Sequence, residues 1–183
     1  MEKTKSDSDI ASRVQNGDRE AFSCLVSRYE ERMGRYAGKF LWAYDDKQDA
    51  VQDVFIKAYM NIKGYDTTRS FSTWLYRVAH NTFIDFIRKR GRERVLSFGI
   101  DMFFAPAASS DESDIERFSK MEAFKELDEK VSVLPPKYRE PLVLHYFEER
   151  TYEEISEILR MPIGTVGIRI SRARALLRKL YEG

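Results

Sequence analysis

Arginine and lysine gather in two stretches of the sequence whose chemistry suits the binding of a polyanion. Between Arg69 and Arg94 there are seven basic and two acidic residues, a balance of +5. Between Arg160 and Gly183 there are six basic residues and one acidic residue, again +5. The stretch Asp111–Val131 carries eight acidic and four basic residues, or −4. Two basic patches separated by an acidic stretch indicate two contacts with one nucleic acid.

Residues that could carry out catalysis are sparse and scattered. His80 and His145 are far apart in the sequence, and neither has a second histidine or a cysteine at metal-ligand spacing. The sequence has no glycine loop that would cradle a phosphate and no nucleophile elbow. Cys24 lies between Phe22 and Val26, so we expect a packed core thiol rather than a redox switch. These features predict a protein that is not an enzyme and needs no cofactor or metal.

Composition limits the cellular setting. The chain has 183 residues, of which 43% are hydrophobic and 33% are charged, enough for one ordinary domain or two small ones. No stretch approaches the roughly 18 consecutive apolar residues that would span a bilayer. The first ten residues lack the apolar core of a secretory signal, and a single cysteine fits a reducing compartment. We therefore expect a cytoplasmic protein with no membrane insertion of its own.

Helical periodicity dominates the sequence and strand-like alternation is nearly absent, which predicts an all-α protein. Asp18 and Asp46 are expected to cap the helices that follow them. Pro141 must make the helix around it begin late or kink. The expected helices cover residues 10–16, 19–42, 47–62, 71–90, 137–147, 152–159 and 163–180, with further periodicity over 115–134.

The pattern is lost between Gly91 and Ser113. Residues 105–112 are small, polar and acidic, which is typical of a flexible linker. Phe98–Phe104 is too apolar for a bare tether, so it is expected to dock on this protein or on a partner. The sequence therefore predicts two helical modules on either side of a linker.

The C-terminal module contains the parts of a helix-turn-helix. Thr151 and Glu154 have the spacing of a capping box, in which each side chain bonds the other residue's amide. Only three residues, 160–162, separate this short helix from a longer basic one, as in DNA-binding helix-turn-helix proteins. Along the long helix, Val166, Ile170, Ala173, Leu177 and Leu180 form one apolar stripe. The opposite face and its flanks hold Thr165, Ile168, Arg169, Ser171, Arg172, Ala175, Arg178 and Lys179, side chains able to contact bases and phosphates.

Several motifs in one order resemble a known family. Two lie in the basic N-terminal module, at residues 49–59 (DAVQDVFIKAY) and 72–82 (STWLYRVAHNT). Others are GDREAF at 17–22, LPPKYR at 134–139, YEEI at 152–155, GTV at 164–166 and SRAR at 171–174. Together they are similar to the bacterial sigma factors of the extracytoplasmic-function (ECF) group of the sigma-70 family.

This resemblance implies a fold and a function. The fold would be a sigma-2 helical bundle at residues 1–92, a flexible linker at 93–114 and a sigma-4 helix-turn-helix domain at 115–183. Such a protein binds core RNA polymerase, directs it to promoter DNA, helps to melt the −10 element and is commonly restrained by an anti-sigma factor. The alternatives are a free-standing helix-turn-helix regulator and a protein-interaction module, and dependence on polymerase for specific DNA binding separates them from a sigma factor.

Residue roles follow from the same resemblance. The polymerase-binding segment corresponds to Asp49, Gln52, Asp53 and the aromatic anchor Phe55. The residues expected at the −10 element are Asp66, Thr67, Thr68, Arg69, Phe71, Trp74, Arg77, Asn81, Arg88 and Lys89, with Phe71 offering a stacking surface and Trp74 placed either there or in the core. The residues expected at the −35 element are Thr165, Ile168, Arg169, Ser171, Arg172 and Arg174.

One position departs from the family pattern. Gly167 stands where these proteins usually carry lysine or arginine, which removes an expected phosphate or base contact. Glycine also weakens a helix by up to about 1 kcal/mol relative to alanine. We therefore expect an unusual −35 specificity that depends on Ile168, Arg169, Ser171 and Arg172.

Overall fold

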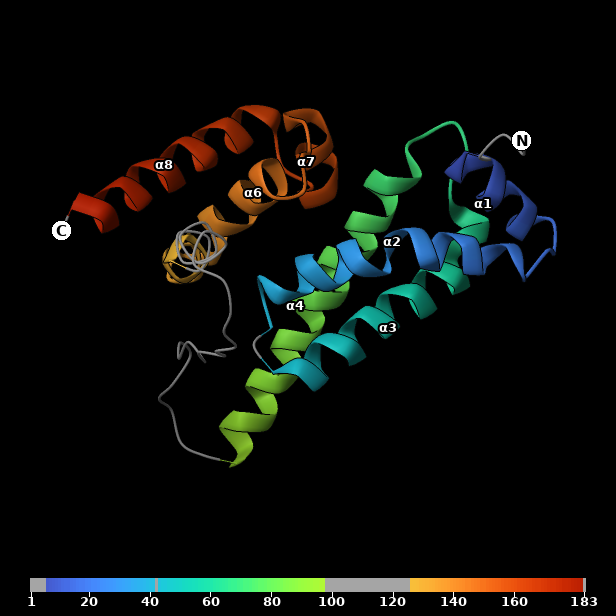
Figure 1. Ribbon diagram of the computed structural model, residues 1–183, viewed down its shortest axis with the longest axis horizontal. Coiled ribbons are helices and arrows are strands. Elements are labelled where there is room, and N and C mark those ends of the chain that lie inside the picture. Colours follow the sequence, from blue (N-terminus) through green and yellow to red (C-terminus); the bar gives the residue numbers. More distant parts are fainter. Residues whose placement is uncertain (1–5, 42, 98–125, 183) are drawn as a thin grey trace, which may run out of the picture. The chain divides into compact units, whose positions relative to one another are not determined.

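The computed structural model describes residues 6–41, 43–97 and 126–182, and within these ranges all regular structure is helical (Figure 1). The chain divides into two compact units, with the main boundary between residues 98 and 99. The expected docking segment Phe98–Phe104 lies outside the described residues. The prediction of an all-α fold is confirmed.

The first unit is a bundle of four α-helices and one short 3-10 helix. In chain order, α1 packs on α2, α2 on α3 and α3 on α4 (Figure 1). The elements are α1 (Asp7–Gln15), α2 (Ala21–Gly38), α3 (Tyr44–Asn61), η1 (Ile62–Gly64) and α4 (Phe71–Ser97). The last helix thus continues past residue 90, where the sequence pattern predicted its end.

Two helix starts differ from those predicted, and local capping explains one of them. α1 begins earlier than predicted because Ser6 and Asp9 form a capping box, with each side chain bonded to the other's amide at 3.1–3.2 Å. Asp46 is not the cap of α3, which begins at Tyr44 and holds Asp46 inside its first turn. An acidic side chain there still favours the helix through the dipole. Asp18 does accept a bond from the Ala21 amide of α2, at 3.2 Å.

Aromatic rings form the core that holds α4 against α2. Tyr36 is fully buried, and its ring lies 5.1 Å from that of Phe40, 5.3 Å from Tyr76 and 5.5 Å from Phe83. Rings at these separations add to the stabilisation from area burial alone. Cys24 is exposed on α2, so the expectation of a packed thiol was wrong. Its neighbours Phe22 and Leu25 are buried, but a helix turns each residue by about 100° and directs Cys24 outward.

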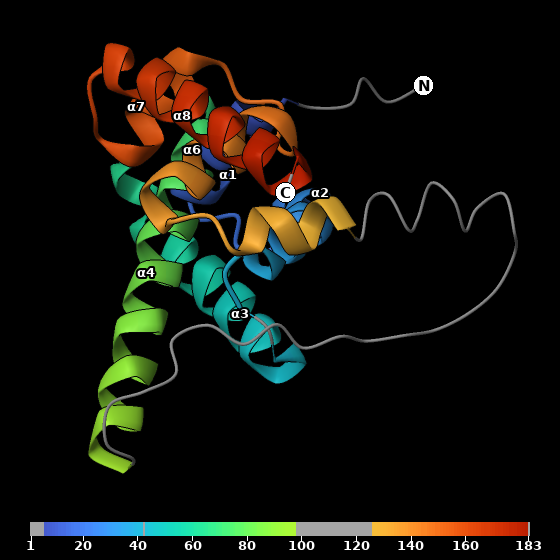
Figure 2. The same cartoon turned by 90° about the vertical axis from the view of Figure 1, so that its left-hand side faces the viewer.

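The second unit contains a helical segment at residues 126–132 followed by α6 (Pro136–Tyr146), α7 (Tyr152–Leu159) and α8 (Ile163–Glu182) (Figure 2). α6 packs along α8. The helix around Pro141 does not begin late, because Pro136 occupies its first position, where a missing amide costs nothing.

A buried arginine joins the helical segment 126–132 to α6. Arg139 is 6% exposed and donates a 2.8 Å hydrogen bond to the carbonyl of Ser132. Burial lowers the pKa of Arg139, because desolvation disfavours its charged form. Arg139 therefore orders the segment that leads into α6.

Candidate nucleic-acid and polymerase interfaces

The turn between α7 and α8 has a defined backbone structure. The predicted capping box is present, with Thr151 accepting from the Glu154 amide at 3.2 Å and Glu154 accepting from the Thr151 amide at 2.9 Å. At the other end of α7, the Met161 amide donates to the carbonyl of Ser156 at 3.1 Å, and Arg160 has φ of +50°. This is a Schellman motif, which usually has glycine at the left-handed position. Both ends of α7 are thereby fixed, as is the direction in which α8 departs.

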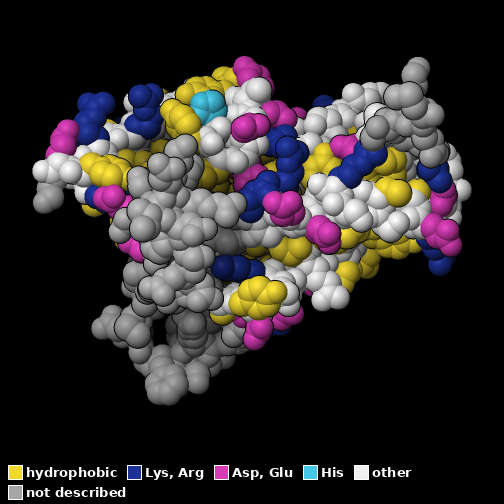
Figure 3. All heavy atoms as spheres, in the orientation of Figure 1, with side chains coloured by type: hydrophobic (Ala, Val, Ile, Leu, Met, Phe, Trp, Pro, Cys, Tyr) yellow, Lys and Arg dark blue, Asp and Glu magenta, His cyan; other side chains and the backbone are white. Residues whose placement is uncertain are grey.

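α8 divides into a buried and an exposed face as its sequence predicted. Val166, Ile170 and Ala173 are at most 1% exposed. Leu180 departs from the predicted stripe, at 42% exposure, because it lies at the end of the helix. Basic side chains stand along the outer side of α8 in Figure 3. Of the residues predicted for the −35 element, Ile168, Ser171, Arg172 and Arg174 are exposed, and Thr165 and Arg169 are half-buried.

Gly167 lies against an aromatic cluster that sequence reasoning missed. A Cβ atom at this position would stand 3.5 Å from Cε2 of Tyr152. The Tyr152 ring in turn packs edge-on to His145 at 5.0 Å, and His145 packs on Tyr146 at 4.7 Å. His145 Nδ1 lies 2.9 Å from the carbonyl oxygen of Arg150, which can only accept, so Nδ1 carries the proton. The short α6–α7 connection brings these rings together.

In the first unit, the loop predicted to capture a −10 base is ordered by its own polar side chains. Asp66 accepts bonds from the Thr68 amide at 3.0 Å and the Thr68 hydroxyl at 2.7 Å, and its other oxygen lies 3.8 Å from Arg69. These bonds to Thr68, followed by the charge of Arg69, lower the pKa of Asp66. Asp66, Thr68 and Arg69 are exposed and Thr67 is half-buried, so the loop presents polar groups to a ligand.

Helix α1 holds this loop from outside it, a role the sequence analysis did not predict. Gln15 donates to the carbonyls of Ile62 at 2.8 Å and Tyr65 at 2.7 Å. The buried Tyr65 donates its hydroxyl to the Arg69 carbonyl at 2.6 Å, and Ser8 lies 3.2 Å from the same hydroxyl. Burial raises the pKa of Tyr65, so it stays a neutral donor. The loop is therefore fixed at its base, and the polar side chains at its tip are mostly exposed.

The aromatic residues predicted beside this loop are in the core. Phe71 is 3% exposed and Trp74 is 8% exposed, with their rings packed at 5.5 Å from each other. Phe71 therefore offers no face to a base in this conformation, which corrects its assignment as a stacking surface. Trp74 lies in the core, which is one of the two positions predicted for it. The remaining predicted residues follow along α4: Arg77 is half-buried, and Asn81, Arg88 and Lys89 are exposed.

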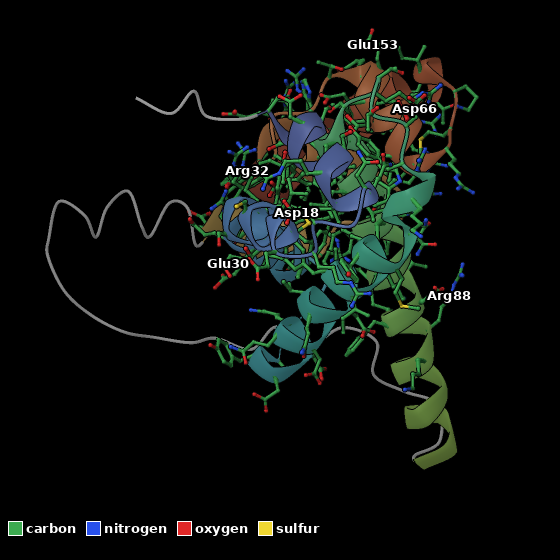
Figure 4. All side chains as sticks on the ribbon, turned by 90° about the vertical axis from the view of Figure 1, so that its right-hand side faces the viewer. Asp18, Glu30, Arg32, Asp66, Arg88 and Glu153 are labelled. Atoms are coloured by element: carbon green, nitrogen blue, oxygen red, sulfur yellow. The ribbon has the colours of Figure 1, made fainter. Side chains whose placement is uncertain are left out.

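Three of these polar side chains share one side of α4. Arg77, Asn81 and Arg88 are spaced by four and seven residues, which brings them to nearly the same angle around a helix. Figure 4 shows Asp66 at the turn before α4 and Arg88 further along the helix, directed away from its axis. The loop and this side of α4 therefore both present polar side chains on the first unit.

The segment predicted to bind polymerase carries a mixed acidic and apolar surface. Asp49, Gln52 and Asp53 are exposed on α3 as predicted, whereas Phe55 is only 9% exposed and is not a free anchor. Ile56 and Met60 are 48% and 74% exposed on the same side of α3 as the two aspartates. Their spacing of 49, 53, 56 and 60 follows the helical repeat, so the sequence contained this signal.

A groove runs between α2 and α3. Its volume is about 860 Å³ and its lining is mainly apolar. Hydrophobic side chains lie at the surface over these two helices in Figure 3. The lining includes Val26 from α2 and Gln52, Phe55, Ile56 and Met60 from α3. One wall of the groove is therefore the predicted polymerase-binding segment.

Comparison with known proteins identifies the family. Residues 25–93 match the model of sigma-70 region 2, and residues 124–177 match that of sigma-70 region 4. The ECF RNA polymerase sigma factor SigW of Bacillus subtilis (strain 168) is 37% identical over 172 residues, covering 91% of this chain and 91% of SigW. This chain is an ECF sigma factor of the sigma-70 family.

Other sigma factors match over most of their length. The ECF sigma-E factor of Haemophilus influenzae is 32% identical over 187 residues, covering 100% of this chain and 98% of that protein. The fold is shared with CnrH in its complex with the cytosolic domain of CnrY, with a TM-score of 0.72, 24% identity and coverage of 97% and 98%. It is also shared with the sigma factor RpoE of Bartonella quintana in complex with the anti-sigma factor NepR, with a TM-score of 0.72, 24% identity and coverage of 88% and 96%.

Family membership fixes the function at the level of the whole protein. This sigma factor directs RNA polymerase in promoter-specific transcription initiation, and it is not an enzyme. Among the described residues, no helix is long and apolar enough to cross a membrane.

Proposed function

We propose that the two units divide promoter recognition between them. Residues 1–92 bind core polymerase and capture the −10 element, residues 115–183 read the −35 element, and residues 93–114 link them. The observation that supports this most directly is the sidedness of α8, whose apolar residues are buried while Ser171 and Arg172 are exposed. A helix presented in this way by a short capped helix and a tight turn fits a major groove.

The −35 assignment is tested with Arg172→Ala. An arginine that bonds a guanine edge contributes about 1–3 kcal/mol to the binding free energy. Holoenzyme, that is core polymerase with this sigma variant, should therefore bind promoter DNA about 5- to 150-fold more weakly. Arg178→Ala is the comparison, because Arg178 is an exposed arginine of the same helix that is not among the residues predicted to read the −35 element, so its loss should cost less and leave base preference unchanged. Equal losses for the two variants would mean that α8 contributes charge without reading sequence.

The polymerase assignment is tested on α3. Charge reversal by Asp53→Lys should weaken core binding by about tenfold or more, because it replaces an acidic group suited to a basic partner surface with a cation. Ile56→Ala should also weaken binding, since it removes an exposed apolar contact of the same surface. Glu129→Lys makes the same reversal at an exposed residue of the second unit and should leave core affinity unchanged.

The −10 assignment is tested by promoter opening. Asp66→Ala removes the acceptor of both Thr68 bonds. It should slow opening of the −10 element while leaving core binding and affinity for the closed −35 duplex intact. If opening is unchanged, the loop does not capture a −10 base.

The experiment that tests the whole proposal is transcription from a fragmented genomic library. Bacterial core polymerase with and without the purified protein is used, and the transcripts are sequenced. Start sites that need the protein and share −35 and −10 elements support the proposal and supply promoters for the tests above. A protein that does not bind core polymerase would contradict it.

We further propose a cytoplasmic sigma factor that is held by an anti-sigma factor. Both structural neighbours described above are complexes, one with the cytosolic domain of CnrY and one with the anti-sigma factor NepR. In this chain, the α2–α3 groove offers an apolar surface bordered by predicted polymerase contacts. An anti-sigma factor bound there should compete with core polymerase, and Ile56→Ala should weaken both complexes. Simultaneous binding of both proteins would argue against a shared surface.

A further inference from the structure

α1 contacts the loop before α4 through two side chains that share one face of this helix. Ser8 and Gln15 are seven residues apart, which brings them to nearly the same angle around a helix. α1 packs against both η1 and α4, the two elements that residues 65–70 connect (Figure 1). Gln15 donates to the carbonyl of Tyr65 at 2.7 Å, and the Ser8 hydroxyl lies 3.2 Å from the Tyr65 hydroxyl. α1 therefore bonds Tyr65 at both its backbone and its side chain.

The Tyr65 hydroxyl closes the loop on itself. It lies 2.6 Å from the Arg69 carbonyl, which can only accept, so the tyrosine donates its single proton there. The Tyr65 oxygen then accepts the proton of Ser8, which fixes the direction of the bond from α1. Tyr65 is 4% exposed, and its ring lies 5.4 Å from that of Phe71 and 5.2 Å from that of Trp74. A ring packed in this way holds its hydroxyl, and with it the Arg69 carbonyl, in one place.

Between these two fixed points the polar tip of the loop forms a turn. The Arg69 amide donates to the Asp66 carbonyl at 3.0 Å, and the Asp66 carboxylate accepts from the amide and the hydroxyl of Thr68. Ser70 then accepts from the Thr73 amide at 3.2 Å through its side chain, as the N-cap of a helix does. Asp66 and Thr68 are exposed, so packing does little to fix the tip. Its shape depends on these bonds and on the two fixed points.

A fixed turn matters for a site that selects one base. A site built to hydrogen-bond one polar edge rejects other edges because its own polar groups would be left unpaired, which requires groups that do not shift to meet them. A loop that is ordered before binding also loses less conformational entropy when it closes on a ligand. Because Tyr65 is buried, it acts on a captured base only through the tip of the loop.

We propose that Tyr65 and Gln15 are positioning residues that set the base preference of this loop. The inference rests on the proposed function, in which the loop captures a flipped −10 base. It extends that function from the exposed tip to a buried tyrosine and to α1, a helix with no predicted DNA contact of its own. Base preference at the −10 element, in addition to the stability of the first unit, then depends on the Tyr65 hydroxyl and the Gln15 amide.

The test uses Tyr65→Phe, which removes the hydroxyl and keeps the ring, and Gln15→Met, which removes the amide and keeps the length of the side chain. Holoenzyme with each variant is bound to single-stranded oligonucleotides that carry the −10 element of a mapped promoter. In these strands each base is replaced in turn, or removed to leave an abasic site. Each variant should bind the native strand about 3- to 10-fold more weakly than the wild-type chain, the usual effect of one hydrogen bond.

The abasic strand distinguishes base capture from general weakening. Preference between the native base and its replacements should fall by the same factor, at the position where Asp66→Ala also loses preference. On the strand that is abasic at this position, the wild-type chain and both variants should bind equally, because no base is left to capture. Core binding and affinity for the −35 duplex should be unchanged.

Phe40→Leu is the matched control for a loss of stability alone. The Phe40 ring packs on Tyr36 and Phe83 in the aromatic core. Phe83 is twelve residues along α4 from Phe71, which corresponds to about 18 Å of helix. Unfolding in denaturant should show that Phe40→Leu destabilises the first unit. Its preference among −10 bases should nevertheless equal that of the wild-type chain.

Two comparisons separate failure of the proposed function from failure of the positioning role. If the wild-type chain and Asp66→Ala bind all strands alike, the loop captures no base, and the proposed −10 function and this inference both fail. If Asp66→Ala loses preference while Tyr65→Phe and Gln15→Met keep it, only the positioning role is overturned. The same holds if the loss in these two variants persists on the abasic strand or is shared by Phe40→Leu, because they would then act through stability.

Discussion

Gln15 and Tyr65 are joined across about fifty residues by a hydrogen bond of 2.7 Å from the glutamine side chain to the tyrosine carbonyl. The same amide group donates to the carbonyl of Ile62 at 2.8 Å. Both carbonyls belong to the connection between α3 and α4, where the Tyr65 amide also donates to the Ile62 carbonyl at 3.0 Å. The short helix α1 therefore supports the loop predicted to capture the −10 base.

Gln15→Met should destabilise the first unit by about 1–3 kcal/mol, because a side chain of similar length leaves the part-buried Tyr65 carbonyl without its donor and removes one of two donors to the Ile62 carbonyl. Both tryptophans, Trp42 and Trp74, fall within residues 1–98, so tryptophan fluorescence in denaturant follows the unfolding of this unit. Gln48→Met is the control, since Gln48 is exposed and bonds only the exposed Tyr44 hydroxyl. Its effect should stay within about 0.5 kcal/mol. Equal stability of the two variants would contradict an anchoring role for Gln15.

The loop should loosen in acid through Asp66. Its bonds from Thr68 and the charge of Arg69 lower its pKa below the ordinary value of 3.8. A carboxyl group with a depressed folded pKa stabilises the fold above its unfolded pKa, and this contribution is lost as the pH falls through the folded value. The chemical shift of the Thr68 amide proton should therefore titrate with a midpoint below 3.8, and Asp66→Asn should abolish the titration. A midpoint at or above 3.8 would show that these bonds do not form in solution.

Features set by interactions between residues close in the sequence were predictable. The capping box of Thr151 and Glu154 needs only residues three apart, and the stripe Val166, Ile170 and Ala173 follows from the helical repeat. Both predictions are confirmed by the observed bonds and burial. The same repeat would also have placed Ile56 on the acidic side of α3 and Cys24 outward on α2, had it been applied there.

Other features depend on contacts between distant segments. Phe71 follows a polar loop in the sequence. In the fold, however, the ring of Tyr29 on α2 packs against the Phe71 ring at 5.7 Å and covers it. The support from Gln15 likewise requires α1 to lie beside η1. No local pattern encodes such pairings, because they depend on how the bundle closes. The exposure of the polar residues in the loop predicted to capture the −10 base was therefore predictable, whereas the scaffold of that loop was not.

Arg160 occupies a backbone conformation that favours glycine. Its φ of +50° brings Cβ close to the backbone, at a cost of roughly 1–2 kcal/mol for residues other than glycine. Arg160→Gly should therefore stabilise the turn by about 0.5–1 kcal/mol after the entropy cost of glycine is included. Hydrogen exchange of the Met161 amide, which closes the turn on Ser156, measures this directly.

Arg160→Ala separates backbone strain from loss of the arginine side chain. Alanine keeps Cβ, so this variant should show none of the gain seen with glycine. Slower exchange of the Met161 amide in both variants would point to the side chain instead of the backbone.

Gly167→Ala should stabilise α8 by about 0.5–1 kcal/mol, since glycine in a helix interior is less favourable than alanine by that amount. The new methyl group has room, because its nearest neighbour, Cε2 of Tyr152, would be an ordinary contact at 3.5 Å. Gly164→Ala is the control, with nothing within 4 Å and a place in the first turn of α8, where the gain should be smaller. Hydrogen exchange of the buried Ile170 and Ala173 amides reports both variants. Destabilisation by Gly167→Ala would mean that the Tyr152 ring cannot accept even a methyl group, and that glycine is required there for packing.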